Sequence, residues 1–155
     1  MVAKKTSRFA SKFKNTFSYD SRIENVRKER SVKDDQPKLS LNFKDFDSNQ
    51  CPPGQTFEEW QEQKCLSVLM QKFVDICAYN VSEALQKGLL KIYGDFPAKS
   101  DFTKPSYIMG DVQWGTIQRI GGQKPRLAGY IIGSVFYPVF LDKEHRFFIS
   151  TKKHT

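Results

Sequence analysis

The chain has 155 residues, which is enough for one well-packed domain and too few for two domains with full hydrophobic cores. Its 25 Lys and Arg against 17 Asp and Glu give a formal net charge of +8, an excess that attracts phosphate backbones and anionic surfaces. No run approaches the roughly 18 apolar residues needed to span a bilayer, and no secretory apolar stretch follows the basic start. These features argue against a membrane or secreted protein, and we expect a cytoplasmic one.

Residues 1–38 predict a basic arm that is flexible or becomes ordered on a partner. The stretch is charge-dense, poor in Leu and Ile, and without sustained periodicity. Phe9, Phe13 and Phe17 recur every four residues, so a helix would align them on one stripe. A free tail, a docking segment for a protein partner and a mitochondrial targeting segment are alternatives. The arm also carries cations that we expect to contact nucleic acid: Lys4, Lys5, Arg8, Lys12 and Lys14.

Residues 39–155 predict a single α+β domain, whose first half is mainly helical. Leu39 to Phe43 alternates apolar and polar residues, which favours a short strand or an extended clip. Thr56 and Glu59 have capping-box spacing, and the apolar stripe behind them predicts one long amphipathic helix over residues 57–78. A second cap at Asn80 and a terminator at Gly88 predict a short helix.

From residue 89 onward the pattern changes to strands and turns. Glycine-containing turns follow residue 120 and residue 132, which is typical of hairpins. We therefore expect a small antiparallel sheet of three to five strands packed against the long helix. Pro138 inside one strand indicates an edge strand or a bulge. The expected strands cover residues 90–93, 114–120, 126–132, 135–141 and 146–151.

The three cysteines predict reduced thiols and no metal site. Cys51, Cys65 and Cys77 are odd in number and lack the paired spacing of metal ligands. Cys65 and Cys77 fall in the helical pattern and are expected in the core. The glycine pairs lack the strand-turn-helix setting of a phosphate loop or a dinucleotide-binding fingerprint. We therefore expect no cofactor.

The two histidines are the candidate proton-transfer groups. His145 follows the polar run that begins at Asp142, and His154 lies in the basic ending. An imidazole exchanges protons near neutral pH, and neighbouring cations can stabilise a phosphorane. RNA cleavage requires only such groups, because the 2′-hydroxyl is the nucleophile. The alternative is that residues 142–144 form an ordinary polar turn capped by His145.

Arg119 and Arg126 flank the Gly121-Gly122 turn and are expected to lie near each other in a hairpin. Two guanidinium groups so placed can hold a phosphate, and Arg126 is also a candidate catalytic cation. Pairing with carboxylates of the helix is the alternative. The remaining expected nucleic-acid contacts are Arg146, Lys152 and Lys153.

The C-terminal half resembles a family of small bacterial proteins that share its hairpin, a Leu-Asp-Lys-x-His element and a Lys-Lys-His-Thr ending. The element is residues 141–145 here. The element order also resembles that of RelE-type toxins, which are compact ribonucleases that cut mRNA with basic residues and a late His or Tyr. The resemblance covers about the last hundred residues, and the long arm departs from it. It implies that the residues carrying activity are Arg119, Arg126, His145 and His154.

Three functions are compatible with these observations. The first is a metal-independent, ribonuclease-like toxin or phage-defence effector that acts on RNA by general acid–base chemistry. The second is a non-catalytic, nucleic-acid-binding accessory subunit of a nucleoprotein complex, with a protein partner on the arm. The third is an adaptor whose arm binds an acidic protein.

Overall fold

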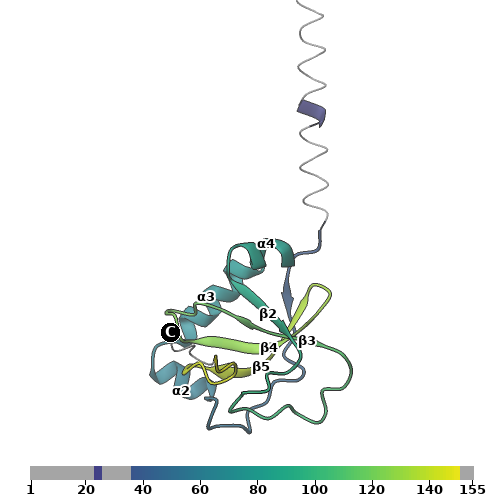
Figure 1. The fold of residues 1–155 in the computed structure, drawn as a ribbon. Helices are drawn as coiled ribbons and strands as arrows, with labels where there is room; N and C mark the ends of the chain where they lie inside the picture. The colour runs from purple at the N-terminus through teal and green to yellow at the C-terminus, as the bar shows by residue number, and fades with distance from the viewer. Residues whose placement is uncertain (1–22, 26–35, 151–155) are drawn as a thin grey trace, which may run out of the picture. The chain divides into compact units, whose positions relative to one another are not determined.

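A computed structural model describes residues 23–25 and 36–150 (Figure 1). The chain divides into two units after Pro37, and the second unit begins at Lys38. Residues 23–25 form an exposed helical turn. The expected arm cations, the C-terminal lysines and His154 lie outside the described residues.

The unit is an α+β fold built on a five-stranded sheet. The sheet order is β1-β5-β4-β3-β2. β1 runs parallel to β5, while the other neighbouring pairs are antiparallel. The sheet is therefore mixed, which corrects the antiparallel expectation. In chain order the elements are β1 (Ser40–Leu41), α2 (Phe57–Glu62), α3 (Leu66–Ile76), α4 (Val81–Gln86), β2 (Leu90–Gly94), β3 (Gln113–Ile117), β4 (Arg126–Ile132) and β5 (Val135–Asp142).

The single long helix expected over residues 57–78 is wrong, because the chain breaks it into α2 and α3. Lys64 adopts a left-handed backbone with φ of 59°. Its N–H donates to the Gln61 carbonyl at 3.0 Å, and the Cys65 N–H donates to the Trp60 carbonyl at 2.8 Å. These bonds form a Schellman motif, which ends α2 although no glycine marks the position. No helix among residues 36–150 is long and apolar enough to cross a membrane.

The expected helix caps are confirmed. The Thr56 hydroxyl accepts from the Glu59 N–H while the Glu59 carboxylate accepts from the Thr56 N–H. Asn80 and Glu83 make the same reciprocal pair at the start of α4. Gly88, with φ of 67°, ends α4 as expected. Each cap satisfies amides that would otherwise lack partners.

The strands agree with the pattern except at the end. Pro138 lies in β5, which is an inner strand, and the β4–β5 register shifts beside it. The prediction of a bulge at Pro138 is therefore confirmed, and the alternative prediction, that its strand lies at an edge of the sheet, is wrong. The strand expected over residues 146–151 is wrong as far as the structure describes it, because residues 146–150 are bends and coil. The Asp101 N–H donates to the Arg146 carbonyl and the Ile149 N–H to the Lys99 carbonyl, so this segment pairs with a loop instead.

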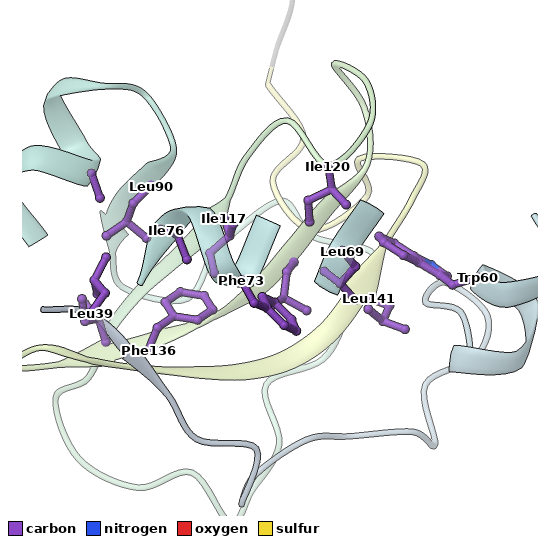
Figure 2. Close-up of a cluster of buried hydrophobic side chains, with 13 residues drawn as sticks. Leu39, Trp60, Leu69, Phe73, Ile76, Leu90, Ile117, Ile120, Phe136 and Leu141 are labelled. Carbon is purple, nitrogen blue, oxygen red and sulfur yellow. The ribbon is translucent and has the colours of Figure 1, made fainter. Parts of the chain in front are cut away.

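The sheet separates two hydrophobic cores. On one face the three helices pack against the strands, and Figure 2 shows Trp60 beside Leu69 at one end of this core and Leu39 at the other. Cys65 and Cys77 pack against the same core, half-buried. On the other face the long β2–β3 loop and the segment after β5 cover the sheet. The buried residues of that second core are Phe102, Ile108, Trp114, Ala128, Tyr130, Val139, Phe140 and Phe147.

Candidate active site

Asp142 organises the turn that carries His145. Its side chain is fully buried, and its two carboxylate oxygens accept from the Arg146 N–H at 2.7 Å and the Phe147 N–H at 2.9 Å. Burial raises the pKa of Asp142, although these two hydrogen bonds and the charges of His145 and Arg126 act in the opposite direction. Asp142 is thus a positioning residue for the turn.

Two neighbouring contacts fix the ends of this turn. At its start, the Gln55 side-chain oxygen accepts from the Lys143 N–H at 2.8 Å and from the indole N–H of Trp60 at 3.1 Å. At its end, the Phe147 ring is fully buried among the aromatic side chains of the second core. The turn is therefore anchored to both layers that flank the sheet.

His145 sits in this turn with a left-handed backbone, φ of 60°. Such a conformation costs a non-glycine residue about 1–2 kcal/mol, and residues held this way cluster at functional sites. The His145 side chain is half-buried. Burial lowers the pKa of His145 below its ordinary 6.5, the charge of Arg126 lowers it further, and Asp142 opposes them. The lowered pKa favours the neutral imidazole, which is the form that accepts a proton.

Arg126 lies opposite Asp142 in the β4–β5 register. Its terminal Nη2 donates to the Gln123 carbonyl at 3.4 Å, a long hydrogen bond. Its Nε is buried and has no hydrogen-bond partner within the described part of the chain. An unsatisfied buried N–H of a cation costs about 1–3 kcal/mol or more. A bound anion would supply the missing acceptor.

Further cations lie close enough to His145 to act on it. Lys91 on β2 and Lys124 in the β3–β4 connection both lower the pKa of His145. Lys91 pairs with Thr116, which pairs in turn with Ala128, two positions from Arg126. Side chains alternate between the faces of a sheet, so Lys91 and Arg126 project on the same face, opposite the helices. We call Lys91, Lys124, Arg126, Asp142 and His145 the basic cluster.

The two expected phosphate-fork arginines do not share a site. A Cβ built at Gly88 would lie 3.6 Å from Arg119 Nη2, so Arg119 reaches toward the end of α4. Arg126 instead lies in the basic cluster. Arg119 also has a positive φ, of 59°, so the chain leaves the regular hairpin register between the two. The Gly121-Gly122 turn is accordingly part of a longer connection, residues 118–125.

Arg146, an expected nucleic-acid contact, forms an ion pair. Its Nε lies 2.7 Å from the Asp101 carboxylate, with both side chains partly exposed. The pair joins the segment after β5 to the β2–β3 loop. The structure thus places Arg146 in a scaffold contact, whereas His145 and Arg126 are brought together.

One other surface feature lies apart from the basic cluster. A surface hollow on the helical layer is lined by Gln61, Lys64, Leu66, Ser67 and Met70. It contains a single charged side chain, Lys64, and no histidine, cysteine or carboxylate, so it offers no chemistry comparable to the basic cluster. Within residues 23–25 and 36–150, no group of three or more His, Cys, Asp or Glu side chains is placed to hold a metal ion.

Comparisons of the chain with protein families, curated proteins and solved structures give no significant match. The assignment of the site therefore rests on its own geometry and electrostatics.

Sequence reasoning missed Lys91 as a site residue and treated Asp142 only as part of a polar turn. Lys91 belongs to a strand distant in sequence, and only the sheet register brings it near His145. For Asp142 the sequence offers no such signal either, because this residue opens a run of five polar residues, which is typical of a solvated turn.

Proposed function

We propose that this protein acts on RNA and cleaves it by general acid–base chemistry at the basic cluster. The observation that carries the proposal is that His145, with a left-handed backbone and a lowered pKa, lies within electrostatic reach of Arg126, whose buried Nε has no acceptor among the described residues. A phosphodiester supplies an oxygen acceptor for Arg126. The net charge of +8 favours the approach of a polyanion.

The proposed reaction needs one base, one acid and cations. His145 accepts the proton of the 2′-hydroxyl, and the 2′-oxygen attacks the adjacent phosphorus. Arg126 stabilises the charge that develops on the phosphoryl oxygens. The bond from phosphorus to the 5′-oxygen breaks, leaving a 2′,3′-cyclic phosphate and a 5′-hydroxyl. That oxygen takes a proton from an acid, a role for which His154, outside the described residues, is the candidate.

The test compares cleavage of labelled single-stranded RNA by the wild-type protein and by two variants. His145→Asn is preferable to His145→Ala, because asparagine tolerates a positive φ. We expect this variant to lose about 10²–10⁴-fold in rate, the usual contribution of a general base. Arg126→Lys should lose roughly 10²-fold because it removes the forked donor while it keeps the charge.

Two controls make the result specific. RNA with 2′-O-methyl groups lacks the nucleophile and should remain intact, and the product ends should include a 2′,3′-cyclic phosphate. Undiminished cleavage by His145→Asn would remove His145 from the mechanism.

A non-catalytic accessory role is the second candidate, and the exposed Lys91 beside half-buried aromatic rings favours it. It predicts RNA binding that weakens with salt while the RNA stays intact. It also places a protein partner on the arm, so deletion of residues 1–30 should abolish complex formation. If the shortened protein joins its complex unchanged, the arm is not the docking segment.

A further inference from the structure

Two aromatic rings stack on the sheet face that carries the basic cluster. Tyr93 follows Lys91 on β2, and Phe148 lies in the segment after β5. Their ring centroids are 4.2 Å apart with an interplanar angle of 6°. Both side chains are half-buried, whereas the neighbouring Phe147 is fully buried. Phe147 thus packs in the second core, and the stacked pair lies where that core meets solvent.

Lys91 joins this pair to the basic cluster. Its Nζ lies 5.2 Å from the Tyr93 ring centroid and 6.0 Å from that of Phe148, which is cation–π range. The same ammonium acts on His145, and only two residues separate His145 from Phe148 in the chain. A cation, two stacked rings and a proton acceptor therefore lie together.

The backbone holds this arrangement in place. The Phe147 anchor and the bond from the Ile149 N–H to the Lys99 carbonyl flank Phe148 on both sides. The Tyr93 hydroxyl lies 3.4 Å from the Thr116 hydroxyl. The rings are consequently fixed before any ligand binds, which reduces the entropy lost on binding.

We propose that the Tyr93–Phe148 pair is a stacking subsite for an unpaired base of single-stranded RNA, with Lys91 on the adjoining phosphate. This inference rests on the proposed function, since it names the form of RNA that the basic cluster would receive. Base-on-aromatic stacking is sequence-tolerant and is worth about 1–3 kcal/mol per base. A duplex, whose bases are already stacked and paired, does not offer that surface.

The test measures binding by fluorescence anisotropy with a labelled, single-stranded 2′-O-methyl oligonucleotide, which cannot be cleaved. Phe148→Leu keeps an apolar side chain but removes the aromatic face. We expect it to weaken binding roughly tenfold. Phe148→Trp should retain the affinity. Ile149→Ala is the control, because Ile149 is the next residue and its side chain is exposed, and this variant should bind as the wild type does.

A second probe separates stacking from charge. An abasic oligomer of the same length keeps the phosphates, so the wild type should prefer the base-bearing strand and Phe148→Leu should lose that preference. Equal affinities of Phe148→Leu, Ile149→Ala and wild type, or no binding by the wild type, would overturn the subsite. No bond is broken in this binding assay, so it can be interpreted even if the protein does not cleave RNA. Conversely, if the protein cleaves RNA but Phe148→Leu does not weaken binding, the stacking subsite is overturned and the cleavage proposal stands.

Discussion

Gly115 on β3 and Gly129 on β4 lie directly opposite each other, and each faces a register shift in the strand on its outer side. A Cβ at Gly129 would lie 2.1 Å from the Tyr137 carbonyl oxygen, and one at Gly115 would lie 2.4 Å from the Lys91 carbonyl oxygen. The strands on either side of this pair, β2 and β5, thus approach β3 and β4 closely at one level, where only glycine leaves room. The two bulges are therefore built around the glycine pair.

Gly129→Ala should destabilise the fold by about 3 kcal/mol or more, because the added methyl group meets rigid backbone. Urea unfolding measures the change. Gly122→Ala is the control, since its Cβ would meet only Pro125 at 3.5 Å, and its free energy of unfolding should stay within about 0.5 kcal/mol of wild type. A Gly129→Ala protein as stable as this control would show that β5 can shift without cost.

Lys64→Gly should stabilise the protein by about 0.5–1 kcal/mol. Relief of the left-handed backbone gains about 1–2 kcal/mol, and the greater freedom of glycine in the unfolded chain takes back about 0.4–1 kcal/mol. Lys64→Ala removes the same side chain and keeps the backbone strain, so it should give no gain. Thermal unfolding of the two variants distinguishes backbone relief from loss of the lysine.

The pKa of His145 should lie below 6.5, since burial and the neighbouring cations disfavour the imidazolium. NMR titration of the imidazole protons measures it, and His145→Asn assigns the signal against that of His154. Arg126→Met removes the largest charge contribution and should raise the midpoint. A midpoint at or above 6.5 in the wild type would contradict the neutral base.

The same shift has a consequence for stability. A lowered pKa in the folded state means that the unfolded chain binds the proton more tightly. The contribution of His145 is therefore fully present above pH 6.5 and is lost as the pH falls toward its folded pKa. As the pH falls through this window, the free energy of unfolding of the wild type should decrease relative to that of His145→Asn. A stability difference that does not change with pH would exclude this coupling between His145 protonation and folding.

Asp142→Asn should lower the free energy of unfolding by about 1–3 kcal/mol, because an amide has only one oxygen for the two N–H donors of residues 146 and 147. The His145 turn loses its anchor, so RNA cleavage should fall as well. Glu144→Gln is the control for loss of a carboxylate, because Glu144 lies in the same turn and is exposed. Unchanged unfolding of Asp142→Asn would show that the contacts of Gln55 and Phe147 hold the turn without the Asp142 carboxylate.

Much of the fold could be predicted because local signals were strong. Capping boxes at Thr56 and Asn80, the helix stop at Gly88 and the strand 126–132 follow from side-chain chemistry within a few residues. The break at Lys64 carries no such signal, since a lysine in left-handed conformation looks like a helix residue in sequence. The parallel pairing of β1 likewise depends on a distant strand.

The site was predictable in part for the same reason. His145 and Arg126 stood out by residue type, and the register of β4 with β5, which sets Arg126 opposite Asp142, explains why the charge of Arg126 acts on His145. Lys91, Tyr93 and Phe148 join them only through tertiary structure. The prediction that Arg119 and Arg126 lie near each other is wrong, because residues 118–125 do not form a tight hairpin turn.

The pairing of β1 with β5 also constrains the order of events during synthesis. Ser40 and Leu41 leave the ribosome early, yet the residues opposite them in the register, Val135 and Phe136, belong to the last strand of the sheet. Closing so long a loop is entropically costly, and such contacts form late. The β1 edge strand therefore joins the sheet only after β5 has emerged from the ribosome.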